Sequence, residues 1–123
     1  MTASVLDITR AHLDAPTLVR LRAALLSGRA AQVATIAEEE ARARELASHR
    51  DVDSILEREL AAASAVRARE AIEEIDAALA RLVAGNYGIC DSCGARIPPE
   101  RLEAIPHARL CVACLRGRRG LLG

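Results

Sequence analysis

The stretch CDSCGARIPPERLEAIPHARLCVAC, residues 90–114, contains all four cysteines of this 123-residue chain. They form two CxxC pairs, CDSC and CVAC, separated by 17 residues. Each CxxC pair makes a tight turn that directs two sulfur atoms toward one point. Four thiolates satisfy tetrahedral zinc and leave no position for a reactive water. We therefore predict one structural Zn²⁺, bound by Cys90, Cys93, Cys111 and Cys114.

The same cysteines have other possible uses, namely iron in a rubredoxin-like site, a redox CxxC motif, or disulfides. A thioredoxin-like redox motif needs a βαβ context, and the sequence has none. The N-terminal residues MTASVLDITR lack the pattern of a signal peptide, and no apolar run is long enough to span a bilayer. We therefore expect a cytoplasmic protein that does not enter a membrane. In that reducing compartment, paired cysteines favour a metal over disulfides.

The composition predicts a mainly α protein. Its 17 basic residues, all arginine, balance 17 acidic residues, so the chain has no overall positive field to attract nucleic acid. Tyr87 is the only aromatic residue, and aromatic rings normally supply much of the area that a globular core buries. The abundant Ala, Leu, Arg and Glu are strong helix formers. Long helices packed side by side are therefore expected.

The first long helix is predicted to begin at DAPTLVRL, where Asp14 or Thr17 can cap it. Gly28 interrupts the pattern and allows a kink or break there, at a cost of about 1 kcal/mol relative to Ala. Apolar residues recur at helical spacing at Leu18, Leu21, Leu25, Val33, Ile36 and Leu46.

A second helix is predicted from a capping box at Ser54 and Glu57 to about Ala84, where the sequence GNYG ends it. Along this helix, apolar residues recur at alternating intervals of four and three positions, which is typical of a coiled-coil seam. The seam consists of Ala61, Ala65, Ala68, Ile72, Ile75, Leu79 and Leu82.

We therefore expect a long antiparallel helical hairpin, a coiled coil, with a small C-terminal four-cysteine zinc-finger head. Residues 1–13 form an N-terminal lead-in, and residues 14–84 form the hairpin with its tip near 47–54. The zinc-finger head covers residues 85–116, and residues 117–123 are a basic tail. The head has few apolar residues between its cysteine pairs, so we expect its folding to need the metal.

Residues 85–114, GNYGICDSCGARIPPERLEAIPHARLCVAC, closely resemble the zinc-finger signature of the DksA/TraR family of bacterial RNA polymerase-binding regulators. The resemblance covers about residues 50–116. Within the signature, we expect Leu102 to fill the small core of the head, and Arg101 and Glu103 to bridge the head to the hairpin. His107 lies near Cys111 and is expected at the surface, because four cysteines already complete the metal site.

The resemblance implies that the hairpin enters the secondary channel of RNA polymerase and changes the stability of promoter complexes without binding a specific DNA sequence. Carboxylates at the tip would act near the catalytic Mg²⁺ of the polymerase. The matching acids here are Asp51 and Asp53, although RDVDSIL departs from the usual D-x-x-D-x-A motif of the family. Asp53 has an alternative role as a helix cap.

The resemblance also bears on the alarmone ppGpp, which relatives bind with basic side chains. An ungapped alignment from the cysteines places those positions on Glu74, Ile105 and Leu115, none of which attracts a phosphate. Arg116 offers a partial substitute. We therefore expect action on the polymerase without dependence on ppGpp.

Three other functions remain open at this point. A zinc-ribbon module that binds DNA or RNA needs a basic or aromatic face, whereas the head has mixed charge and only Tyr87. A redox enzyme would need reactive thiols. A structural adaptor hairpin would need only a stable fold. Transcription regulation fits the sequence best, with no enzymatic activity and no small-molecule substrate.

Overall fold

A computed structural model describes residues 12–122 of the chain, and the side chains as far as Gly117. Most of the predicted lead-in and most side chains of the basic tail lie outside this description. The described residues form four helices, α2 (Ala15–Leu46), α3 (Val52–Ala84), α4 (Pro99–Ala104) and α5 (Val112–Leu122). Their only β pairing is an isolated bridge between Ile89 and Arg96. The predicted mainly α fold is confirmed.

The chain divides into two compact units, and α2 and α3 contribute to both. The hairpin unit comprises Leu26–Ile75. The head unit comprises Met1–Leu25 and Asp76–Gly123, so it contains the cysteines together with one end of each long helix. Within the described residues, no helix combines the length and the apolar character needed to cross a membrane.

Helix α2 begins at a capped position, as predicted. The backbone N–H of Thr17 donates to Oδ1 of Asp14 over 2.8 Å, which satisfies one of the free donors of the first turn. The helix runs through Gly28 without a break. Leu21 and Leu25 are buried, but Val33, which belongs to the same apolar pattern, is 47% exposed.

Helix α3 begins earlier than the predicted capping box. The backbone N–H of Ser54 donates to Oδ2 of Asp51 over 3.0 Å, and the helix starts at Val52. Ser54 is therefore the third helical residue rather than the cap. Asp51 takes the capping role that the sequence had suggested for Ser54 or Asp53.

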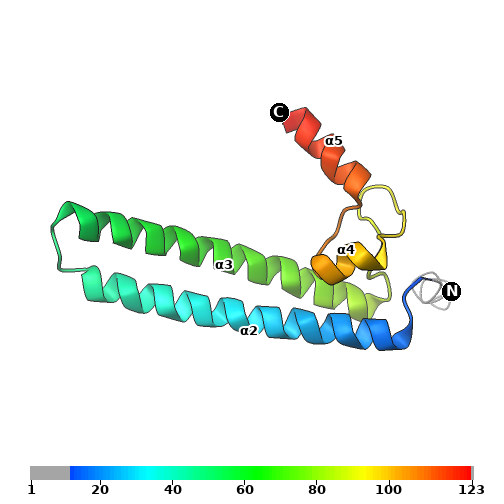
Figure 1. The fold of residues 1–123 in the computed structure, drawn as a ribbon, viewed down its shortest axis with the longest axis horizontal. Coiled ribbons are helices and arrows are strands. Elements are labelled where there is room, and N and C mark those ends of the chain that lie inside the picture. The colour runs from blue at the N-terminus through cyan, green and yellow to red at the C-terminus, as the bar shows by residue number, and fades with distance from the viewer. Residues whose placement is uncertain (1–11, 123) are drawn as a thin grey trace. The chain divides into compact units, whose positions relative to one another are not determined.

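The two long helices run antiparallel in the hairpin unit and are joined by residues 47–51 (Figure 1). Nη2 of Arg42 lies 2.7 Å from Oε2 of Glu57, and Nη2 of Arg69 lies 3.4 Å from Oε1 of Glu40. These pairs link α2 to α3, although exposed ion pairs contribute little to stability.

The buried face of α3 follows the predicted seam only in part. Its buried side chains are Ala61, Ala65, Ala68, Ile75 and Ala78. The predicted positions Ile72, Leu79 and Leu82 are partly exposed, and the fully buried Ala78 was not predicted. The packing of α3 thus depends largely on alanine, whose small side chain allows helices to approach closely.

Candidate metal centre

The first cysteine pair lies on a loop that begins where α3 ends. Gly85 adopts a φ of 85°, and the N–H of Asn86 donates to the carbonyl of Arg81, which is the Schellman arrangement that ends a helix. The N–H of Gly94 donates to the carbonyl of Cys90 over 3.0 Å and closes the turn. Gly94 has a φ of 75°, a conformation that residues with a side chain rarely adopt.

The second cysteine pair lies at the start of α5. Cys111 immediately precedes the helix and Cys114 lies in its first turn, where the N–H of Leu115 donates to the carbonyl of Cys111. The N–H of Asp91 donates to the carbonyl of Arg109 over 2.8 Å. This bond ties the loop of the first pair to the segment that leads into the second pair.

Helix α4 and its flanking residues hold that segment in place. Nε of Arg101 donates to the carbonyl of Leu110 over 3.1 Å, while Leu102 is fully buried as predicted. Glu103 pairs with Arg20 of α2 over 3.1 Å, which confirms its expected bridging role. Arg101 instead bonds within the head, next to Cys111, so the prediction that it reaches the hairpin is wrong.

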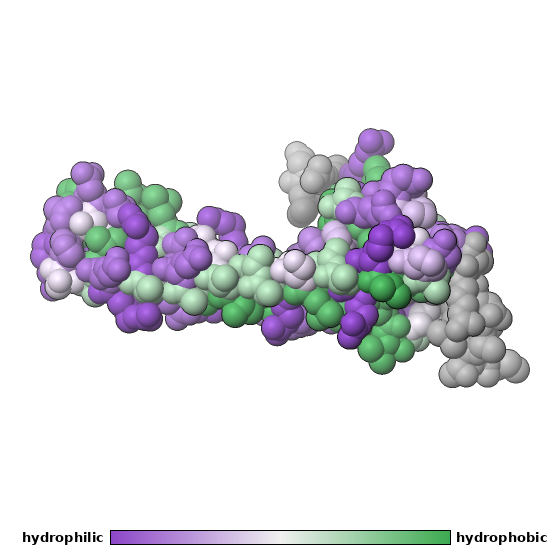
Figure 2. Space-filling model, turned by 60° about the horizontal axis from the view of Figure 1, so that its bottom comes forward, coloured by the Kyte–Doolittle hydropathy of each residue, from purple (hydrophilic) through white to green (hydrophobic). Residues whose placement is uncertain are grey.

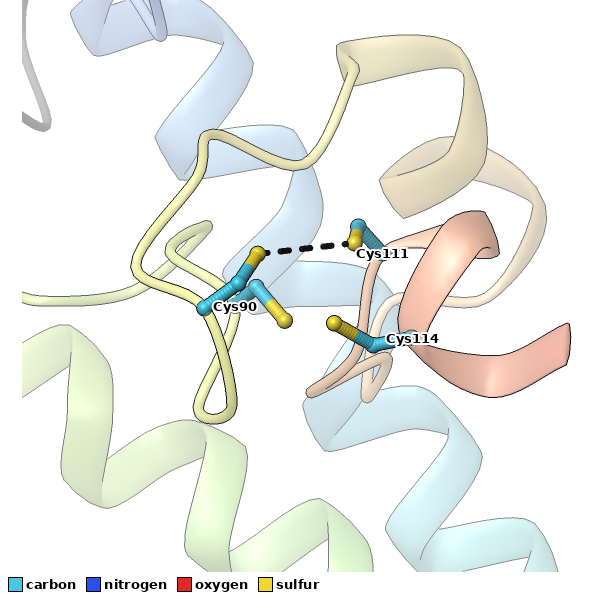
Figure 3. Close-up of side chains that lie close together, drawn as sticks. Cys90, Cys111 and Cys114 are labelled. Carbon is cyan, nitrogen blue, oxygen red and sulfur yellow. Dashed lines mark hydrogen bonds between the residues drawn. The ribbon is translucent and has the colours of Figure 1, made fainter. Parts of the chain in front are cut away.

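The four sulfur atoms lie within 4.8 Å of one another, and Sγ of Cys93 lies 3.7 Å from Sγ of Cys111. A tetrahedron with Zn–S bonds of about 2.3 Å has edges of about 3.8 Å. A disulfide would need about 2.05 Å. Figure 3 shows the thiols of Cys90, Cys111 and Cys114 directed toward a common centre. The group consists of the four cysteines and does not include His107.

The thiols differ in how readily they ionise. Burial alone would raise the pKa of Cys90, but the backbone N–H groups of Cys111, Cys93 and Ser92 lower it to about 6. Hydrogen bonds with the Cys111, Cys93 and Cys90 side chains raise the pKa of Cys114 to about 12. Crowded thiols without a cation cannot all ionise. A divalent metal removes this conflict, so the donor set fits Zn²⁺ in a closed structural site.

A small core supports the metal centre. Tyr87 is completely buried, and its hydroxyl donates to the carbonyl of Pro106 over 2.7 Å. His12 Nε2 lies 3.2 Å from the carbonyl oxygen of Ile97. Gly88 has a φ of 84°, and a Cβ there would lie 2.8 Å from Leu13. The contacts of His12 and Leu13 with the head were not predicted, because no periodic pattern marks single contacts between distant segments.

The predicted tip acids lie at the start of α3, and both are exposed. The hydrogen bonds from Ser54 lower the pKa of Asp51, with a smaller contribution from His49. The carboxylate of Asp53 makes no hydrogen bond or ion pair with any described residue. Nη1 of Arg58 donates to the carbonyl of Ala47 and steadies the turn. Of the two acids, Asp53 is therefore the one whose carboxylate is not engaged by another described residue.

Residues 85–119 match the family model described as the prokaryotic dksA/traR C4-type zinc finger. General stress protein 16O of Bacillus subtilis is 50% identical over 44 residues, 36% of this chain and 27% of that protein. The RNA polymerase-binding transcription factor DksA of Haemophilus influenzae is 44% identical over 48 residues, 39% of this chain and 33% of that protein. These matches thus span about a third or less of the curated relatives.

The structural likeness extends much further along the chain. Transcription factor DksA2 from Pseudomonas aeruginosa has a TM-score of 0.79 to this chain at 26% identity, covering 94% of this chain and 95% of that one. Because this likeness includes the long helices as well as the finger, the two similarities reinforce each other. The chain therefore carries a finger that matches the dksA/traR C4-type zinc finger and shares the fold of DksA2, and its four clustered cysteines fit one structural zinc ion.

Proposed function

We propose that this protein is a transcription regulator that binds RNA polymerase and inserts the turn of its hairpin into the secondary channel. The main support is the combination of a DksA/TraR finger with the DksA2 fold over 94% of the chain. Relatives named DksA are RNA polymerase-binding transcription factors. In this proposal the protein acts in the cytoplasm, as a regulator rather than an enzyme, without recognising a DNA sequence.

The tip acids have separate roles in this proposal. Asp51 holds the first turn of α3 through its bond to Ser54. Asp53, two residues further on, presents an unpaired carboxylate to the polymerase active centre. A free carboxylate can interact with a metal ion or a basic side chain there and change the stability of a promoter complex. Zinc contributes only by holding the head in shape, because its four thiolates leave no open position.

Binding to purified core RNA polymerase tests the proposal. The wild-type chain should bind, and it should compete with another secondary-channel factor. Replacing both tip acids, Asp51→Asn with Asp53→Asn, should leave binding unchanged while removing the effect on promoter-complex lifetime. A chain that fails to bind core polymerase, or that binds without competition, would contradict the proposal. Equal binding to DNA alone at low salt would favour a nucleic-acid module instead.

We also propose that the regulator acts without ppGpp. Glu74 carries a negative charge, and Ile105 and Leu115 have no side-chain donor for a phosphate oxygen. Open-complex lifetime should therefore change by the same factor with and without ppGpp, on a polymerase that lacks any other ppGpp site. A strong enhancement by ppGpp would contradict this part of the proposal and leave polymerase binding unaffected.

A further inference from the structure

Large aliphatic side chains lie exposed along one face of α3 in the hairpin unit. Val52 is 80% exposed, Leu56 52%, Leu60 60% and Val66 50%. At 100° per residue these four fall within an arc of about 120°. We call them the outer row. This arc lies nearly opposite the buried positions Ala61, Ala65 and Ala68, so the outer row faces away from α2.

Val66, at one end of the outer row, also borders a groove that alanine side chains line in part. Figure 2 shows hydrophobic surface among strongly hydrophilic surface near the turn between α2 and α3. The open groove has a volume of about 260 Å³ and is lined by Val66, Ala43, Ala61, Ala62, Ala65, Glu39, Glu40 and Arg69. Scattered exposed apolar residues need no explanation, but four large aliphatic side chains exposed on one face of a helix are typical of an interaction surface.

The charge around the outer row identifies the kind of partner. Residues 26–75 contain eleven acidic residues and seven arginines, a net charge of −4, and the rest of the chain has ten arginines and six acids, a net charge of +4. Asp53, Glu59 and Glu70 are exposed at or next to the outer row, with Arg67 as the basic exception. A partner surface with apolar and basic groups is therefore complementary.

A second copy of this chain fits the outer row less well. A twofold pairing centred on residues 52–66 would bring Glu59 against its own counterpart. The four partly exposed side chains offer roughly 400 Å², about half of what each partner contributes to a standard stable interface. A partner whose surface contacts the turn between α2 and α3 as well as the outer row would supply the remaining buried area. The row begins at Val52, directly between the two tip acids.

We infer that the outer row is the surface by which α3 binds an apolar, basic-rimmed wall of RNA polymerase. This inference rests on the proposed function and assigns its two parts, binding and the effect on promoter complexes, to different residues. The outer row supplies affinity, because binding removes its leucine and valine side chains from water. Asp53 supplies the effect on promoter complexes, because its carboxylate reaches the active centre only once the row is bound.

The test compares the affinity for core RNA polymerase of the wild-type chain, the double variant Leu56→Gln with Leu60→Gln, and the control Val83→Gln. Val83 is 90% exposed on α3 but lies outside the outer row. The double variant should bind at least tenfold more weakly and the control equally well. A photo-crosslinking residue at position 60 of the full chain should form a crosslink to polymerase, which does not depend on how the double variant folds.

The alternative outcomes have different meanings. If the wild-type chain binds and the double variant binds equally well, the outer row is not the contact surface, and the proposed function is unaffected. If the double substitution converts a dimer to a monomer without weakening polymerase binding, the row joins two copies, and the inference is overturned. If the wild-type chain does not bind polymerase, both the inference and the proposed function fail.

Discussion

Asp51 and Asp53 are only two residues apart, but the chain uses them differently. The carboxylate of Asp51 accepts a hydrogen bond from the N–H of Ser54 and so caps the start of α3, where a helix favours negative charge. Asp53 has no such partner. The sequence alone left this choice open, because both acids, and Ser54, are good capping residues. Only the position at which the helix begins separates them.

Substitution of Asp51 tests its capping role. Asp51→Ala should lower the thermal midpoint at neutral pH, whereas Asp51→Asn should lower it less, because Asn keeps the capping acceptor and loses only the contribution of the negative charge. The lowered pKa of Asp51 means that the carboxylate stabilises the fold above its unfolded pKa of about 3.9, and this contribution is lost as the pH falls through the lower folded value. An Asp51→Ala variant as stable as the wild type would contradict the assignment.

Tyr87 is the only aromatic side chain, so its ionisation reports on the head alone. Burial raises its pKa to about 12, partly offset by the charge of Arg81. Since the folded pKa lies above the unfolded value of about 10, the phenol stabilises the head fully below pH 10 and loses this contribution as the pH rises toward 12.

A spectroscopic titration of Tyr87 checks this prediction. Phenolate absorbance should appear near pH 12 in the zinc-bound protein and near pH 10 in denaturant. A native midpoint near 10 would show that the ring is not buried in the folded head. Tyr87→Phe removes the signal and leaves the carbonyl of Pro106 without its donor, at a cost of about 1 kcal/mol in the free energy of unfolding.

At the scale of the helices, the periodic pattern predicted both long helices but not their details. The seam was placed on Leu79, whereas Ala78 is buried. Residues 78 and 79 point about 100° apart on a helix, far more than the drift of about 20° per heptad between a straight helix and a seven-residue repeat. Both lie in the head unit, where the contacts of the head rather than the two-helix seam decide which side is covered. Val33 fits the pattern on α2 but is exposed, because helical spacing alone does not say which of two apolar faces is turned inward.

Two glycines should respond in opposite ways to replacement by alanine. Gly28 lies inside α2, and a Cβ there would lie 3.7 Å from Cδ1 of Ile75, which is ordinary contact. Gly28→Ala should therefore stabilise the protein by about 1 kcal/mol. Gly94→Ala should destabilise it, because the position needs a positive φ even though no atom lies within 4 Å of the added carbon. Urea unfolding of both variants gives the comparison. If both substitutions changed the free energy of unfolding in the same direction, this account of the backbone at the two positions would be contradicted.

For the molecule as a whole, the sequence predicted the metal centre more completely than the hairpin tip. Four cysteines in two CxxC pairs leave little choice of ligand, and the sulfur positions agree with that choice. The hydrogen bond from Arg101 to the carbonyl of Leu110 and the contact of His12 with Ile97 could not be predicted from the sequence. Each joins residues that come close together only in the folded head. A functional role for the tip acids stays a prediction.

Removal of zinc should affect the two units unequally. The head relies on thiolates that repel one another without a cation, so a strong chelator should unfold it and expose Tyr87. The hairpin unit contains no cysteine and should keep much of its helical circular dichroism. Metal analysis should give one zinc per chain, and Cys93→Ser should reproduce the chelated state. Iron in the purified protein, or a folded head without metal, would contradict this account.

In the function we propose, this chain regulates transcription through a free carboxylate at its hairpin turn. The most direct measurement is the lifetime of an open promoter complex with wild-type protein, Asp53→Asn and Asp51→Asn, each at a concentration that saturates the polymerase. We predict that the wild type and Asp51→Asn change the lifetime equally, and that Asp53→Asn binds but leaves the lifetime unchanged. A full effect from Asp53→Asn, or no effect from the bound wild type, would contradict the claim.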